Sequence, residues 1–195
     1  MKRLAPLMLA ILLLLTPRLL YAETAMETMT AYINRVLEVL GDPALKGDAG
    51  KNEKTEKIRK IAEDLFDFGE LSRRTLGKSW QQFSADQQTE FISLYKSLLQ
   101  KNYSEKIVSY NDERIVFGKE TTLSEKTSEI ETTLRGKTAD IPINDRLLLK
   151  SGKWSVYDVI IEGVSLINNY RSQFREILAN KPPEGLLDVL RNKVN

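Results

Sequence analysis

The fold is decided by the stretch IPINDRLLLKSGKWSVYDVII, which occupies residues 141–161. Apolar side chains recur with a period near two in both halves, which is typical of β-strands. Ser151 and Gly152 separate the halves, and such a pair between two apolar runs predicts a tight turn. We therefore expect an antiparallel hairpin with strands over residues 141–150 and 154–161. Pro142 has no backbone donor, so it fits the start or the edge of a strand.

The period of two extends upstream, whereas both flanks of the chain have a helical period. Two further runs predict strands, at residues 114–117 and 128–135. Apolar side chains spaced by three and four predict helices over residues 24–40, 85–110 and 164–179, with a tail helix from Glu184. Helices, then strands, then helices indicate a single α+β domain, with an antiparallel sheet of about four strands packed against several helices.

Local signals place several helix ends. Ser84 to Gln87 match a capping box, and Asp67 is expected to cap a short helix that ends at Gly77. Thr55 is expected to cap the helix before it, and the polar residues 46–54 are expected to form a loop.

The first 22 residues have the three parts of a secretory signal peptide. Lys2 and Arg3 precede an apolar run, and a mixed tail ends at the small Ala22. A membrane anchor is the alternative, but the run falls short of the roughly 20 apolar residues that a span requires. We expect cleavage near Ala22, with Leu20 leaving the exact site open. Residues 23–195 would then work outside the cytoplasm.

Removal of this segment changes the net charge. The full chain has 29 Lys+Arg and 27 Asp+Glu, a net charge of +2. Lys2, Arg3 and Arg18 lie in the first 22 residues, which hold no acid, so residues 23–195 carry 26 − 27 = −1. No chain-wide positive field remains to favour nucleic acid as a partner.

The chain contains neither Cys nor His. Disulfides, zinc sites built from these residues, and Ser-His-Asp or Cys-His nucleophiles are therefore excluded. An enzyme would need carboxylates, Lys, Tyr or a hard metal. We expect no catalytic residue, no metal and no cofactor.

Two groups of carboxylates invite an acid–base reading: Asp64 with Asp67 and Glu70, and Asp158 with Glu162. Helix capping explains Asp67 better, and nothing in the spacing indicates separated pKa values. A basic cluster of Arg73, Arg74 and Lys78 could meet a lipid phosphate or a partner, or could be an ordinary solvated helix face.

A more specific signal comes from residues 154–174, WSVYDVIIEGVSLINNYRSQF. They resemble the hallmark of the MlaC family, the periplasmic phospholipid-binding proteins also called toluene-tolerance proteins. LGKSW at residues 76–80, the long helix of residues 84–110 and GLLDVL at residues 185–190 resemble further motifs of that family, in order. Asn144, Asp145 and Arg146 depart from the aromatic-plus-Arg pattern of the family at that strand.

The resemblance implies a curved sheet and helices that enclose an apolar cavity for the acyl tails of a phospholipid. It implies a monomeric shuttle of an ABC-type intermembrane lipid transport system that maintains outer-membrane lipid asymmetry. The partners would be an inner-membrane ABC transporter complex and an outer-membrane lipoprotein complex, with phospholipid as cargo.

Apolar side chains of the expected strands and long helix, read with that architecture, are the candidates for the cavity wall. They are Leu76, Trp80, Phe91, Tyr95, Leu98, Tyr103, Ile107, Val116, Ile130, Leu134, Ile143, Leu147, Val156 and Val164.

Three alternatives stay open. The cargo could be a hopanoid or another envelope lipid. The chain could be a non-lipid periplasmic adaptor whose apolar face binds protein. A carboxylate hydrolase that uses Asp158 is the third.

Overall fold

Helices and strands follow one another in the expected order. The computed structural model describes residues 23–108, 114–137 and 139–194, so the expected signal peptide and Tyr110 lie outside the described residues. The helices are α1 (Ala25–Gly41), α2 (Asp48–Leu65), α3 (Phe68–Leu76), α4 (Ala85–Val108), α5 (Leu166–Leu178) and α6 (Pro183–Val194). The strands are β1 (Arg114–Ser124), β2 (Thr127–Arg135), β3 (Asp140–Lys150), β4 (Lys153–Ile161) and β5 (Val164–Ser165). Single 3-10 turns occupy Pro43–Leu45 and Gly77–Gln82. The expected α+β class is confirmed.

The sheet is a meander in which each strand pairs antiparallel with the next, in the order β1-β2-β3-β4-β5. Ser151 and Gly152 both have positive φ, 53° and 80°, as a two-residue hairpin turn requires. Glu162 and Gly163 repeat this geometry, with φ of 50° and 81°.

The expected helix start at Val164 is wrong, because a short strand follows the second turn. Residues Val164 and Ser165 return along β4 as the short strand β5. Helix α5 then begins at Leu166, where the Ser165 hydroxyl accepts the Asn168 N–H at 3.1 Å.

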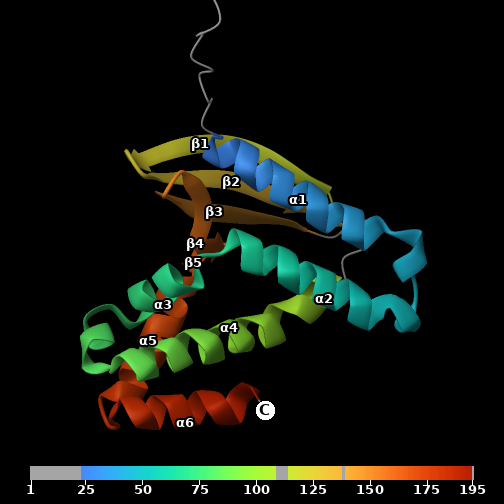
Figure 1. Ribbon diagram of the computed structural model, residues 1–195. Coiled ribbons are helices and arrows are strands. Elements are labelled where there is room, and N and C mark those ends of the chain that lie inside the picture. Colours follow the sequence, from blue (N-terminus) through green and yellow to red (C-terminus); the bar gives the residue numbers. More distant parts are fainter. Residues whose placement is uncertain (1–22, 109–113, 138, 195) are drawn as a thin grey trace, which may run out of the picture.

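The elements form layers (Figure 1). Helix α1 lies along the sheet, and α2, α4 and α6 follow at increasing distance from it. Strand β4 runs from the sheet toward α3 and α5, and so connects the two parts of the molecule. None of the helices in the described ranges combines the length and hydropathy that a bilayer crossing requires.

The predicted caps of α3 and α4 are present. The Asp67 carboxylate accepts the Glu70 N–H at 2.9 Å, and Ser84 and Gln87 exchange the two bonds of a capping box at 3.2 and 3.1 Å. Each bond satisfies a donor that a helix start would otherwise leave unpaired.

The expected loop at residues 46–54 is wrong, because α2 begins at Asp48. Thr55 lies inside this helix, where its hydroxyl donates to the Lys51 carbonyl at 2.8 Å. Lys54 is buried, and its Nζ donates to the Leu40 carbonyl at 3.3 Å. Tertiary contacts of this kind override the weak local preference of a polar segment.

Candidate functional site

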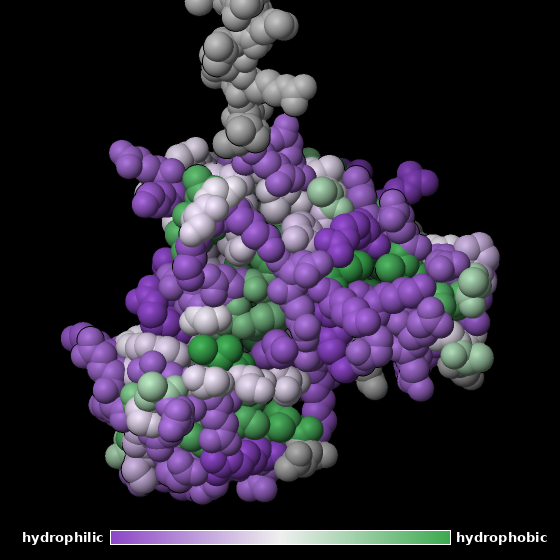
Figure 2. Space-filling view, in the orientation of Figure 1, coloured by the Kyte–Doolittle hydropathy of each residue, from purple (hydrophilic) through white to green (hydrophobic). Residues whose placement is uncertain are grey.

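Two apolar clusters divide the interior. The helical cluster joins α3, α4, α5 and α6, and its buried members include Leu71, Phe91, Tyr95, Tyr170 and Phe174. The sheet cluster joins the sheet with α1 and the end of α2, and its buried members are Ala25, Met29, Leu65, Ile130, Leu147 and Val156. Figure 2 shows that hydrophobic residues reach this surface mainly in the seams between the layers.

The aromatic rings of the helical cluster contact one another. Phe91, Tyr95, Tyr170 and Phe174 have ring centroids 5.1–5.6 Å apart, mostly in edge-to-face pairs. Burial raises the pKa of the Tyr95 hydroxyl, and Asn102 donates to the Tyr170 hydroxyl at 2.9 Å. This region has the contacts of an ordinary close-packed core.

The sheet face that carries Ile130, Leu147 and Val156 is called here the inward face. At the end near the Ser151–Gly152 turn, these three side chains have no exposed area and lie against α1. The Trp154 indole N–H donates to the Glu23 carbonyl at 2.9 Å, which fixes the start of α1 over the sheet. The inward face is therefore closed at this end.

At its other end the inward face stays partly open. Strand pairing forms two rows there, Ile115–Leu134–Ile141 and Phe117–Thr132–Ile143–Ile161. Leu134 and Thr132 are buried, whereas the other members are only half-buried. A contiguous, partly exposed apolar surface of this kind is typical of a binding site. We refer to these two rows as the open end.

Asp145 lies between the closed end and the open end. It pairs with Ile130 on β2 and with Val159 on β4, and its exposed fraction is 7%. In the part of the chain that the structure describes, no side chain or backbone group donates a hydrogen bond to its carboxyl. Desolvation raises the pKa of Asp145 to about 7.

The opposite face of the sheet carries a paired carboxylate. Asp158 is 2% exposed, accepts the Ser165 hydroxyl at 2.7 Å and the Ile167 N–H at 3.1 Å, and has Arg146 at 3.8 Å. These bonds fix the start of α5, which is a structural role. Glu162 lies in the turn after β4 and is exposed, so it forms no carboxylate pair with Asp158.

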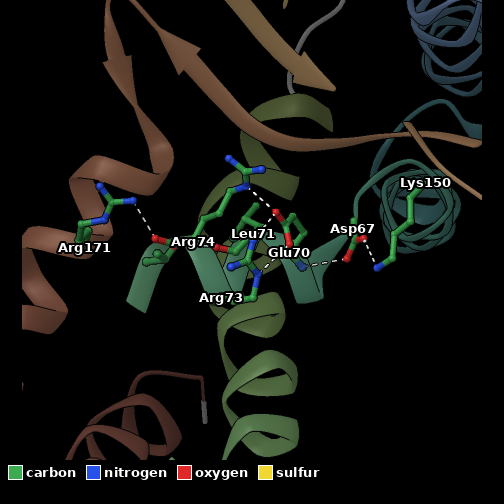
Figure 3. Close-up of polar contacts among 8 residues, drawn as sticks. Asp67, Glu70, Leu71, Arg73, Arg74, Lys150 and Arg171 are labelled. Atoms are coloured by element: carbon green, nitrogen blue, oxygen red, sulfur yellow. Dashed lines mark hydrogen bonds and ion pairs between the residues drawn. The ribbon is translucent and has the colours of Figure 1, made fainter. Parts of the chain in front are cut away.

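The carboxylates of the α2–α3 region are also engaged. Figure 3 shows Asp67 between the start of α3 and Lys150, whose Nζ lies 3.2 Å away. Glu70 accepts from Arg73 and Arg74, mainly from Arg73, and this lowers its pKa. Arg74 also lies over the ring of Tyr157 at 4.1 Å. Across the described ranges, no group of three or more carboxylates is arranged to hold a metal ion.

The structure separates the side chains expected to share one wall. Leu76, Phe91, Tyr95 and Leu98 belong to the helical cluster, and Trp80 and Tyr103 pack against it. Ile130, Leu147 and Val156 line the closed end of the inward face, and Leu134 and Ile143 line the open end. Ile107 is half-buried at the end of α4.

One expected wall residue lies elsewhere, because Val116 pairs with Thr133 on the face opposite to the inward face and is 38% exposed. Val164 pairs with Ile161 and so lies at the edge of the second row, where it is 58% exposed.

Sequence reasoning misses Phe117 of the open end and Asp145 beside it. The strand pattern assigns no face to Phe117, and Asp145 is distinguished only as a departure from the family pattern. The signal for both is the alternation along β1 and β3, once the register is known.

A strap joins the two clusters. Phe66 follows α2, packs against both clusters and pairs with Val156 as an isolated parallel bridge. The next residue, Asp67, donates its N–H to the Val156 carbonyl at 3.0 Å. Phe66 and the stacked Phe68 also line a groove of about 560 Å³, which α4 and the start of β4 complete.

Comparison with known proteins decides the family. The model of the MlaC family, described as MlaC protein, matches residues 30–192. The chain belongs to the MlaC family. The match spans the whole sheet and most of every helix, and it leaves out the first five residues of α1 and the last two of α6.

Individual relatives have low sequence identity to this chain. The intermembrane phospholipid transport system binding protein MlaC of Haemophilus influenzae is 26% identical over 127 residues, which are 63% of this chain and 59% of that protein. A phospholipid-binding protein from Ralstonia solanacearum, solved in complex with a phospholipid, superposes with a TM-score of 0.76. That likeness covers 89% of this chain and 96% of the other at 20% identity, and it shows a shared fold.

Proposed function

We propose that this protein is a phospholipid-binding shuttle of an ABC-type intermembrane lipid transport system that maintains outer-membrane lipid asymmetry. The observation that carries the proposal is the open end of the inward face. Its rows offer half-buried Ile and Phe side chains beside the buried Leu134, in a chain that belongs to the MlaC family. Acyl tails lie along these rows.

Elementary energetics explain why such a cargo needs a carrier. Transfer of one methylene out of water is worth about 0.8 kcal/mol, so two tails with roughly 30 methylenes represent on the order of 20 kcal/mol. A lipid therefore does not cross water alone at a useful rate. Exchange between an apolar site and a membrane is nearly balanced, which permits loading and unloading without catalysis.

The cellular setting follows from the same reasoning. Residues 1–22 are a cleaved signal peptide, and residues 23–195 form the lipid-binding domain in the periplasm. An inner-membrane ABC transporter complex and an outer-membrane lipoprotein complex are the partners of the monomer. Its carboxylates take structural roles, as the bonds of Asp67, Glu70 and Asp158 illustrate, and no enzymatic activity is involved.

The test is to identify the molecule that the protein carries. The full chain is expressed with export to a bacterial periplasm, purified without detergent, and examined by native mass spectrometry and lipid extraction. We expect a phospholipid in a one-to-one complex. A hopanoid in its place changes the cargo, and a ligand-free protein that binds no apolar probe overturns the carrier function.

Two neighbouring residues give a matched pair of variants. Phe117 lies in the open end, whereas Val116 lies on the opposite face. We expect Phe117→Glu to lose most of the bound lipid, because a carboxylate in the tail site is poorly solvated. Val116→Glu adds the same charge one residue away and should retain the lipid. Circular dichroism on both variants controls for loss of fold, and equal lipid content in the two would contradict the assignment of the wall.

A further inference from the structure

The most unusual group on the inward face is the carboxyl of Asp145. The β3 residues on the inward face are Ile141, Ile143, Asp145 and Leu147. Asp145 thus interrupts an apolar series in the middle of a central strand. Its pairing partners Ile130 and Val159 supply no polar side-chain atom.

Nearby polar side chains are occupied by other bonds. The Thr132 hydroxyl donates to the Ile143 carbonyl at 3.2 Å, and the Ser128 hydroxyl donates to Glu120 at 2.8 Å. Glu120 in turn accepts the Met26 N–H at 3.2 Å, which ties β1 to α1. Neither of these two hydroxyls donates to the Asp145 carboxyl.

Asp158 shows how this chain treats a buried carboxylate that serves the fold. It lies on the neighbouring strand, on the opposite face, and it receives a hydroxyl, a backbone N–H and a nearby guanidinium. Buried polar groups in folded proteins almost always have such partners, and an exception calls for an explanation. At Asp145 the position itself suggests one, because it borders the open end.

We propose that Asp145 is an internal polar anchor of the lipid site, which donates a hydrogen bond from its protonated carboxyl to an ester carbonyl of the bound lipid. The proposal rests on the proposed lipid-binding function and specifies the ligand class as ester-linked. An ester carbonyl accepts but does not donate, so it matches a neutral carboxyl and not a carboxylate. Burial raises the pKa of this group to about 7, so it carries its proton at slightly acidic pH.

The anchor explains how an apolar site can select among lipids. Apolar walls bind any tail of suitable length, because the hydrophobic effect has no direction. A single buried donor discriminates against ligands that leave it unpaired. The ester groups of a phospholipid lie where the tails meet the head group, so Asp145 would fix how deeply the tails enter.

The experiment compares two synthetic phosphatidylcholines of equal chain length, one with ester-linked and one with ether-linked tails. Affinities are measured at pH 6 by displacement of a fluorescent lipid from the full-length mature protein. Wild-type protein should prefer the ester lipid by about fivefold, which corresponds to one neutral hydrogen bond. No variant is needed for this first comparison.

Three variants then assign the preference to one side chain. Asp145→Leu should bind both lipids equally well. This variant should stay folded, because the substitution removes an unpaired buried carboxyl. Asp145→Asn keeps a neutral donor and should retain the preference for the ester. Thr132→Val removes a hydroxyl from the adjacent row, where the bond is internal, and should also retain it.

The outcomes separate the two proposals. Equal affinity of wild-type protein for both lipids, or a preference that survives Asp145→Leu, overturns the anchor and leaves the shuttle function intact. Failure of wild-type protein to bind either lipid overturns the shuttle function, and the anchor with it.

Discussion

The helical cluster and the open end of the inward face contain similar side chains but differ in how these are covered. Phe91 is fully buried and has three aromatic neighbours, whereas Phe117 is half-buried at the margin of the sheet cluster. Within the described ranges, the Tyr170 hydroxyl has a hydrogen-bond partner and the Asp145 carboxyl has none. The comparison indicates that the helical cluster maintains the fold, and in our proposal the sheet provides the surface for the lipid.

The largest effect on stability is expected from a substitution in the helical cluster. Phe91→Ala should lower the free energy of unfolding by about 3–5 kcal/mol, because it removes a buried ring and leaves a cavity. Phe117→Ala, at a half-buried site, should cost about half as much or less. Urea denaturation of lipid-free protein measures both. A similar loss for the two variants would mean that the open end is as closely packed as the helical cluster.

The second prediction concerns the pH dependence of stability. The folded-state pKa of Asp145 is about 7, above its ordinary value of 3.8, so the folded protein binds a proton that the unfolded chain releases. Stability should therefore fall as pH rises from about 4 to 7, by about 3–4 kcal/mol from this group.

Asp145→Asn isolates this contribution. Glu63, Glu70 and Glu129 have lowered pKa values and act in the opposite direction, since their stabilisation is lost as pH falls. The difference between wild-type and variant stability removes their effect. If that difference does not change with pH, the carboxyl of Asp145 has a partner in solution.

The third prediction measures what the lipid adds. A ligand at about 100 times its dissociation constant stabilises the folded state by about 2.7 kcal/mol. Lipid-loaded protein should gain that amount over delipidated protein, and Val116→Glu should gain it too. Phe117→Glu should gain little. A gain that disappears in Phe91→Ala but persists in Phe117→Glu would transfer the binding site to the helical cluster.

The smallest effects are expected at two helix caps. One lies within the helical layer, and the other also connects this layer to the sheet. Ser84→Ala removes an exposed cap of α4 and should cost about 1 kcal/mol. Ser165→Ala removes the cap of α5 and also a partner of buried Asp158, so about 2–3 kcal/mol is expected. Thermal unfolding of the two variants gives the ratio, and equal losses would mean that the Ser165–Asp158 bond contributes nothing.

Sequence reasoning succeeded where the signal is local. The caps at Asp67 and Ser84 and the turn at Ser151–Gly152 depend on residues within three positions of one another, and all are present. The WSVYDVIIEGVSLINNYRSQF block also led to the family, because it contains a turn, a cap and the buried Asp158 in a fixed spacing.

The remaining features depend on contacts between distant segments. The pairing of β1 with β2 shifts by one residue between Phe117 and Glu120, and that of β3 with β4 shifts after Arg146. A bulge of this kind changes which face each later side chain occupies, and the alternation alone does not reveal it. Val116 and Phe117 precede the first bulge, and for them the missing information was which face of β1 lies against α1. Helix α2 begins earlier than expected because Lys54 contacts the end of α1. The polar sequence of this segment does not predict that contact.

The strap at Phe66 and Asp67 has a consequence for how the molecule opens. At the strap the sheet cluster and the helical cluster share Phe66, and one backbone bond joins Asp67 to Val156. Subglobal opening that lifts α1 from the sheet can proceed while α4, α5 and α6 stay folded. Amide hydrogen exchange would then divide the chain into two cooperative units, with amides of α1 exchanging through the lower-energy event. In that case a lipid enters by a local fluctuation, and the lifetime of the loaded state is set by the unit that contains α1.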